Sequence, residues 1–483
     1  MGWLRKFFST ESMVPERLRV GELLPTEEAY RNLMRLAVPS VLEMVLMALI
    51  SMADTMMVST MGTNAIAAVG LVTQPRLIML CFFYALNTGV TAIVARRRGE
   101  GNRDAANLTL RNAILVALVI IAGLMAITLP FSKQIIRMVG GVPGVTLEDG
   151  TTYFRIIALA LPANALSMCI CAAQRGVGNT KLTMYVNVIS NAVNVLFNWL
   201  LINGIGPFPR WGVKGAAVAT AIGLCVGLVL SVYSLFHTHR HTAFLRLSLH
   251  DKWRFDKSAL MAISKVGKSA LLEQLCIRGG FLIYAMIVAN LGTNEYAAHI
   301  IGIQFLQLSF SFGDGVGVAS TALVGQMLGK KRPDLAHMYG KIAQRFALIL
   351  SIALAVVVVT CRAGLVNLFI YSDTANDQYV RELAMRVMIV VAAMQPFQTS
   401  AVVSTGALRG AGDTRYVAFS MILTVVGMRP LLSFGAVTLI GKTLELPELA
   451  LIGAWCVALL DMITRMVLML RRYNGGKWHA IKL

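Results

Sequence analysis

Long apolar stretches alternate with short polar or charged segments along the whole chain. Each stretch has about twenty residues or more, enough for a helix to cross a hydrocarbon core about 30 Å thick. Gly, Pro, Asn and clusters of Lys and Arg fill the breaks. The pattern predicts twelve membrane-spanning helices, at 33–60, 66–95, 107–130, 153–174, 182–203, 213–237, 266–290, 294–327, 337–360, 380–405, 414–438 and 448–470.

Composition supports this interpretation. The 483 residues are 57% hydrophobic and 14% charged, whereas a soluble domain has about 25% charged residues. The composition therefore excludes a soluble domain and predicts an all-α polytopic membrane protein. Residues 1–32 are basic and interrupted by Pro15, which is unlike a cleavable signal peptide, so we expect an N-terminal segment on the cytoplasmic side.

The net charge of +20 is distributed unevenly. Most Lys and Arg lie in every second loop, and the alternate loops hold few. By the positive-inside rule this places both termini in the cytoplasm of a cell-membrane protein with an even number of spans. The same distribution makes the bilayer, and not nucleic acid, the expected partner.

Metal and disulfide chemistry find no support in the sequence. The seven cysteines lie in or beside apolar stretches and form no CxxC pair, so we interpret them as small apolar side chains. His237, His239 and His241 have a spacing that could bind a metal, but they border a charged linker and are interpreted as a solvated surface. No cofactor and no metal are expected.

The two halves of the chain repeat each other. RGVGNT at 175–180 recurs as RGAGDT at 409–414, and MGTNAIAA at 61–68 as LGTNEYAA at 291–298, with Glu43 matching Glu273. Two homologous six-helix units follow, and because six is even both enter the membrane in the same direction. The predicted domains are a segment 1–32, an N-lobe 33–237 (helices 1–6), a linker 238–265, a C-lobe 266–470 (helices 7–12) and a tail 471–483.

The glycine-rich hexapeptides have two possible meanings. A phosphate-binding loop would require GxxxxGK[ST], which is absent. We therefore interpret them as the elbow between the fourth and fifth helix of each unit, with Arg175 and Arg409 at the level of the lipid headgroups.

Several stretches together resemble one family. They are MADTMMVSTMGTNAIAAVGL at 52–71, AAQRGVGNTKLTMYVNVISNAVNVLFNWLLINGIG at 172–206, ASTALVGQMLGKKRPDLA at 319–336 and GALRGAGDTR at 406–415. The chain is similar to multidrug and toxic compound extrusion (MATE) transporters, and more to the DinF-like than to the NorM-like branch. The resemblance implies two six-helix lobes around a central cleft that alternates between outward and inward states. It also implies export of amphipathic organic cations, driven by inward flow of H⁺ or Na⁺.

Two carboxylates lie on the first predicted helix. Glu43 and Asp54 are 11 residues apart, which places them on the same side of an α-helix, and Pro39 can kink this helix. An ionised carboxylate in the bilayer costs about 3 kcal/mol on insertion scales, and a protonated one much less. Such groups are therefore candidates for carrying a proton.

The resemblance suggests roles for the acidic residues. Asp54 aligns with the acid that couples protons in the DinF-like branch, although it could instead be a buried structural carboxyl. Glu273 matches a seventh-helix glutamate linked to cation coupling in NorM-like relatives, and Glu43 is its repeat equivalent. This pair could couple cations or brace the two lobes.

Amides stand at positions where relatives carry acids. The fifth helix has a polar stripe of Asn187, Asn191, Asn194 and Asn198. These side chains could form hydrogen bonds between helices or line the cleft. Asn198 is often aspartate in the family, and Gln398 stands where the NorM-like pattern expects aspartate. An amide cannot titrate, so the site is predicted to differ from both patterns, and protons are favoured over Na⁺.

Arg429 is an intramembrane cation that needs a partner, for which Asp461 and Glu273 are candidates. Arg278, Arg465 and Asp314 are interpreted as members of ion pairs within a lobe in preference to substrate contacts. His299 is expected to be a satisfied core histidine.

The predicted function is a cation-coupled, most simply H⁺-coupled, antiporter that exports small organic cations as a monomer. A Na⁺-coupled MATE exporter and a flippase for lipid-linked substrates of the same superfamily are the alternatives. A major-facilitator transporter would need a Gly-x-x-x-Asp-Arg-x-Gly-Arg loop, which is absent. A membrane prenyl transferase would need clustered aspartates, and no DDxxD run occurs, so an enzyme is not expected.

Overall fold

The computed structural model describes residues 7–59, 61, 63–140, 144–237, 244–247, 253–370 and 374–481. Over these ranges the chain is helical and contains no strand. The elements in chain order are η1 (Glu16–Leu18), α2 (Thr26–Ser59), α3 (Thr63–Gly99), α4 (Arg103–Thr128), α5 (Ser132–Met138), α6 (Val145–Leu159), α7 (Leu161–Gly176), α8 (Thr180–Asn203), α9 (Gly212–His237), α10 (Lys257–Ala289), α11 (Thr293–Gly329), α12 (Pro333–Asn367), α13 (Ala375–Ala411), α14 (Thr414–Met421), η2 (Ile422–Met428), α15 (Arg429–Ala436), η3 (Val437–Thr443), α16 (Pro447–Asn474) and η4 (Lys477–Ala480).

The helices form two compact units. The N-terminal unit comprises residues 42–271, and the C-terminal unit comprises residues 1–41 together with 272–482. The helix α2 therefore begins in the C-terminal unit, and α10 begins in the N-terminal unit.

Most predicted spans are present as long helices. Within the described ranges, ten helices are long and apolar enough to cross a membrane, and the bent pair α6 and α7 would make an eleventh span. The expected eighth span corresponds to α11, which is 37 residues long but less apolar, because glutamines, serines, glycines and an aspartate interrupt it. The helical membrane-protein class is confirmed.

Two spans differ from the single straight helices that the sequence predicts. The fourth is broken into α6 and α7, which meet at 46° around Ala160. Pro162 begins α7, where its missing N–H removes no helical hydrogen bond. The eleventh consists of α14, the π-helix η2, α15 and the π-helix η3, and Pro430 lies at the start of α15.

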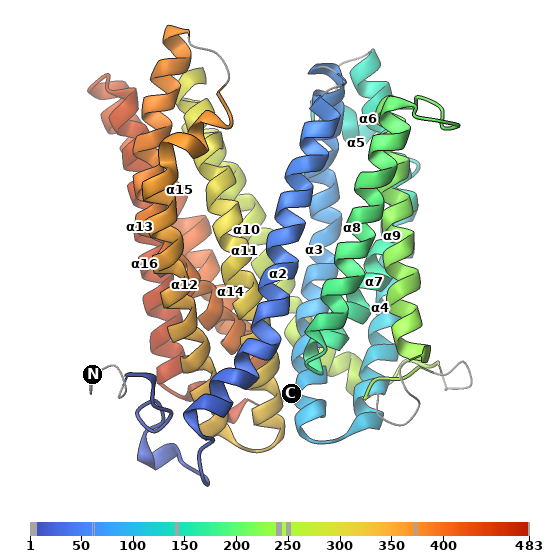
Figure 1. Cartoon of the computed structure of the whole chain (residues 1–483), viewed down its shortest axis with the longest axis vertical. Helices are drawn as coiled ribbons and strands as arrows, with labels where there is room; N and C mark the ends of the chain where they lie inside the picture. Colours follow the sequence, from blue (N-terminus) through green and yellow to red (C-terminus); the bar gives the residue numbers. More distant parts are fainter. Residues whose placement is uncertain are drawn as a thin grey trace. The chain divides into compact units, whose positions relative to one another are not determined.

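Glycines set the closest helix contacts within each unit. In the C-terminal unit a Cβ at Gly406 of α13 would meet the Gly317 carbonyl of α11, and one at Gly410 would meet the carbonyl of Thr321. In the N-terminal unit α8 and α9 run side by side (Figure 1), and a Cβ at Gly223 of α9 would lie 2.7 Å from the Ser190 carbonyl of α8. Small residues allow such close packing in a membrane, where the hydrophobic effect gives no preference for helix–helix contacts over helix–lipid contacts.

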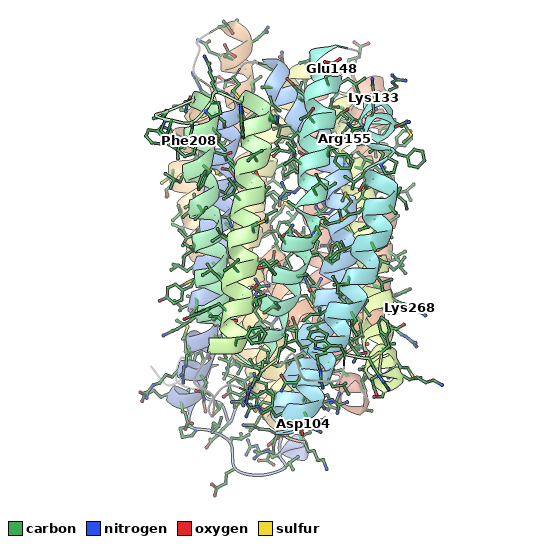
Figure 2. The ribbon with its side chains drawn as sticks, turned by 90° about the vertical axis from the view of Figure 1, so that its right-hand side faces the viewer. Asp104, Lys133, Glu148, Arg155, Phe208 and Lys268 are labelled. Atoms are coloured by element: carbon green, nitrogen blue, oxygen red, sulfur yellow. The ribbon has the colours of Figure 1, made fainter. Side chains whose placement is uncertain are left out.

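Side chains far apart in the sequence mark the two ends of the N-terminal unit. Figure 2 shows Lys133, Glu148, Arg155 and Phe208 at one end, and Asp104 and Lys268 at the other. Asp104 lies in the first turn of α4, next to a Lys- and Arg-rich loop, and Phe208 lies between α8 and α9, in a loop that holds few Lys and Arg. These two loops thus lie at opposite ends of the unit.

Segments outside the spans pack on their units. Met13 and Val14 are buried in the core of the C-terminal unit, where Arg332 donates to the carbonyl of Glu22 over 2.8 Å. In the N-terminal unit Leu245 and Leu247 of the linker are buried, so this part of the linker packs on the unit. Two of the linker histidines, His239 and His241, lie outside the described residues.

Candidate ion-coupling site

The polar stripe of α8 faces α2 in a parallel register. Asn187 bonds to Glu43, Asn191 to Met47 and Asn198 to Asp54. Each pair is separated by 144 residues, so the two helices run in the same direction side by side. Both carboxylates of α2 thus lie on one side of the helix, as their spacing predicts. The stripe holds α2 and α8 together over about three helical turns.

Asp54 is held by neutral donors. Asn198 donates to Oδ1 over 2.9 Å. In the amide orientation that satisfies both of its ends, Asn194 donates to Oδ2 over 2.9 Å and accepts from the backbone N–H of Thr220 in α9 over 3.0 Å. Arg76 of α3 acts on Asp54 electrostatically, but Asp54 forms no ion pair with the described part of the chain. Asp54 is half-buried, so its carboxylate is held by hydrogen bonds and is still partly exposed.

Glu43 has a different environment, because it is buried and paired. Arg175 donates to its Oε1 over 2.5 Å, and Asn187 donates to the same oxygen over 2.6 Å. Thr183 donates to Oε2 over 3.1 Å. The carboxylate is 1% exposed, and the side chain of Arg175 is 20% exposed. Charge-assisted hydrogen bonds of this kind are stronger than neutral ones and fix the position of the Glu43 side chain.

The same ion pair recurs in the C-terminal unit. Arg409 of the second hexapeptide donates to Glu273, which is also 1% exposed. The repeat therefore preserves a glutamate on the first helix and an arginine in the elbow. Both arginines were expected among lipid headgroups; instead they reach inward, because a buried carboxylate needs a counter-charge. The polar stripe does not recur, since Met421 and Val425 occupy the places of Asn187 and Asn191.

Arg429 is paired with Asp461, which settles the choice of partner left open by the sequence. Its Nε donates to Asp461 Oδ2 over 2.7 Å, and Arg465 donates to both carboxylate oxygens over 2.8 Å. The guanidinium also lies 4.9 Å from the ring centre of Phe281. Two buried cations share one carboxylate, and a cation–π contact stabilises Arg429 further.

The remaining polar residues behave differently from one another. Gln398 is fully buried, and its amide has no hydrogen-bond partner in the described ranges. His299 lies among Tyr284, Tyr296 and Trp455, but its Nδ1 is unpartnered there, so it is a core residue that is only partly satisfied. Asp314 is exposed and forms no ion pair with any described residue, contrary to the expectation of a partner within its lobe.

The MatE family model matches residues 39–200 and again residues 270–434, which is more than half of the chain. The chain belongs to the MatE family. The two matches fall on the two halves of the repeat. The MatE chain is therefore a transporter and not an enzyme.

Curated relatives of this MatE chain cover nearly all of it. "Probable multidrug resistance protein NorM" of Thermotoga maritima is 29% identical over 94% of this chain and 95% of its own length. "Multidrug resistance protein MdtK" of Pectobacterium atrosepticum is 26% identical over 92% and 94%. The family prediction is confirmed. The DinF-like branch stays a prediction, because these relatives are named NorM and MdtK.

Solved structures show the same fold. A transporter of the MOP superfamily from Pyrococcus furiosus gives a TM-score of 0.84 at 19% identity, covering 93% of this chain and 97% of that one. A MATE structure described as the bent conformation gives 0.81 at 18% identity, covering 93% and 96%. At such identity the comparison supports the fold alone. The all-α, twelve-helix fold in two lobes is confirmed.

Sequence reasoning found the acids of the site but missed part of their surroundings. Arg175 and Thr183 complete the contacts of Glu43, and Thr220 donates to the Asn194 amide that bonds to Asp54. Arg175 could have been found, because it and Glu43 both recur in the second half, at offsets of 234 and 230. Neither threonine has a comparable signal in a single sequence.

Proposed function

We propose that this MatE protein is a proton-coupled exporter of small organic cations and that Asp54 is the coupling carboxylate. One observation carries the proposal. Glu43, Glu273 and Asp461 each have an arginine partner, whereas Asp54 has neutral amide partners. A carboxylate with a fixed counter-ion stays ionised, while one held by amides can exchange a proton for a cation.

The surroundings of Asp54 suit both protonation states. When ionised, it accepts the hydrogen bonds of Asn198 and Asn194, and its charge attracts a cation. When protonated, its O–H needs an acceptor, and the buried Oδ1 of Asn198 has no partner in the described ranges. Loss of the proton therefore favours cargo binding, and its return favours release. Competition between the proton and the organic cation for Asp54 then links inward proton flow to export of the cation.

Protons suit this chain better than Na⁺. A sodium site needs several oxygen ligands, and the buried acids Glu273 and Asp461 of the C-terminal unit already bind arginines. Gln398 supplies no charge at the position where NorM-like relatives carry an acid. We therefore assign Glu43 and Glu273 to bracing their units, through Arg175 and Arg409. Na⁺ coupling through Asp54 and its amides remains the alternative for the test.

The experiment uses purified protein in proteoliposomes, with ethidium as the cation and an imposed pH gradient. We expect the gradient to drive ethidium transport and Asp54→Asn to abolish it. Asp104→Asn is the matched control, because Asp104 is an exposed carboxylate at the end of the unit. Full transport on a Na⁺ gradient at clamped pH would refute proton coupling. Full activity of Asp54→Asn would refute the site.

The proposal also covers the membrane in which the protein lies and the side on which its termini lie. The loop charges support a cell-membrane protein with both termini in the cytoplasm. We further propose that it acts as a monomer surrounded by lipid and without a cofactor. Protease added to sealed, right-side-out vesicles should leave tags at both termini intact. Cleavage of either tag in intact vesicles would contradict this orientation.

A further inference from the structure

A polar face of exposed and half-buried side chains runs along α11. Gln304, Gln307, Ser311 and Asp314 follow i, i+3, i+7 and i+10, the spacing of one helical face. Gln304, Gln307 and Asp314 are exposed, and Ser311 is half-buried. The Ser311 hydroxyl bonds back to the Gln307 carbonyl. The other three side chains make no hydrogen bond or ion pair with the described residues.

The packing contacts of α11 near Asp314 lie on its other sides. Gly313 and Gly317 lie against Val402 of α13, and Gly315 lies against the backbone of Val41 in α2. On a helix with 100° per residue, Asp314 points between these two contact directions. The neighbouring glycines therefore hold Asp314 at a fixed place, away from the contacts with Val402 and Val41.

A polar face at this depth is unfavourable against lipid. A charged side chain in the hydrocarbon costs about 3 kcal/mol, and such groups face water or a ligand when they occur in spans. Asp314 lies in the interior of α11, 15 residues from its C-terminal end. The face thus needs a polar environment, and its one formal charge is negative. Charge complementarity points to a cation as its occupant.

We propose that this face of α11 binds the charged group of the organic cation, with Asp314 as its counter-ion. The inference rests on the proposed function, because it names where that cargo is held. The amides of Gln304 and Gln307 orient polar groups of the cargo, and Phe310, half-buried beside the face, contacts its apolar body. Arg409 acts on Asp314 electrostatically, but its hydrogen-bond partner is Glu273.

The face is not part of the repeated framework. The equivalent positions of α3, 230 residues earlier, are Gln74, Leu77, Cys81 and Tyr84. No carboxylate matches Asp314, whereas the bracing pairs of Glu43 and Glu273 recur in both units. A framework role would be expected in both halves, so the difference favours a role in recognition.

Direct binding tests this assignment without any ion gradient. Fluorescence polarisation of ethidium with detergent-purified protein at fixed pH should show about tenfold weaker binding for Asp314→Asn, since this variant lacks the counter-charge for the cation. Asp314→Glu should retain most of the affinity, and Asp104→Asn should retain all of it. A neutral amphiphile such as Nile red should bind Asp314→Asn as it binds the parent.

Two results would overturn the inference. One is unchanged ethidium affinity in a folded Asp314→Asn protein. The other is an equal loss of affinity for ethidium and Nile red, which would indicate a structural role. The test of Asp314 can be told apart from the test of proton coupling. Asp314→Asn should raise the KM for ethidium but should still transport ethidium in response to a pH gradient. Asp54→Asn should lose that response. If the parent shows no pH-driven transport, the binding measurement with Asp314→Asn still tests whether this face binds the cation.

Discussion

Asn198 donates a hydrogen bond of 2.9 Å to Asp54, and its own side-chain oxygen is buried without a partner in the described ranges. The amide of Asn198 therefore donates a hydrogen bond to the ionised carboxylate through its NH₂ group. Its oxygen can accept a hydrogen bond from the protonated carboxyl group. The pairing makes Asn198 the most direct control over when Asp54 exchanges its proton.

Asn198→Asp should move the pH dependence of transport toward higher pH by about one unit or more. Two carboxylates at hydrogen-bond distance cannot easily both ionise, so they hold a shared proton more tightly than one does. Initial rates of ethidium efflux measured between pH 5.5 and 9 test this. Asn198→Ser, which keeps a neutral hydrogen-bonding group, should leave the midpoint close to that of the parent. An unmoved midpoint for Asn198→Asp would show that the two side chains are not coupled.

The pair of Glu273 and Arg409 should contribute to stability as a unit. Glu273→Gln leaves the guanidinium of Arg409 without its counter-charge, and loss of one partner of a buried pair costs about 3–5 kcal/mol before allowance for solvent. Because Arg409 is 25% exposed, we expect the lower end of this range or less. The midpoint of thermal unfolding in detergent should fall for the single variant.

The double variant Glu273→Gln with Arg409→Gln provides the control for that measurement. It removes both charges, so it should recover a large part of the lost stability. The equivalent variants of Glu43 and Arg175 should behave in the same way. A double variant as unstable as the sum of its single variants would argue against a paired role.

Asp461 should be the least replaceable acid of the C-terminal unit. Asp461→Asn leaves Arg429 and Arg465 buried without a counter-charge, and Arg429 is fully buried. Arg465→Met leaves Arg429 paired with the same carboxylate, so its effect should be smaller. We expect the unfolding midpoint to fall in the order Asp461→Asn more than Arg465→Met, with little folded protein recovered for the former. The reverse order would show that the second arginine provides more stability than the shared acid.

Gly410→Ala should weaken the packing of α13 against α11. A Cβ there would lie 2.3 Å from the carbonyl oxygen of Thr321, a backbone atom that cannot rotate away. Gly279→Ala in α10 is the control, because no atom lies within 4 Å of its added Cβ; Ala favours a helix over Gly by roughly 0.5–1 kcal/mol. Thermal unfolding should show loss for the first and no loss for the second. Equal midpoints would mean that the helices separate without penalty.

The fold was accessible from the sequence to the extent that it depends on hydrophobic length and repetition. The spans, the duplication and the shared face of Glu43 and Asp54 follow from residue spacing alone. The break at Ala160 and the π-helices around Arg429 did not follow, because a proline after an apolar run can begin a new helix or remain within one. Pro39 of α2 and Pro396 of α13 lie inside continuous helices.

Partners across helices were harder to predict than the acids themselves. Spacing along α2 shows which way Asp54 points, but the identity of the facing residue depends on how α8 is placed, which local pattern does not encode. Asp314 illustrates the same limit. A glycine-flanked aspartate in an apolar run looks like half of an ion pair, and the exposure of its whole face only becomes visible when α11 is packed against α13.

The boundaries between the two units fall at 41/42 in α2 and 271/272 in α10, 230 positions apart, which is the offset of the repeat. Asn32, near the start of α2, donates to Tyr339 of the C-terminal unit, and Gly89 of α3 lies against Ile263 near the start of α10. The opening turns of α2 therefore pack within the C-terminal unit, and those of α10 within the N-terminal unit. Two separate six-helix chains built on this plan would each lack the turns that the other supplies, whereas a single polypeptide contains both.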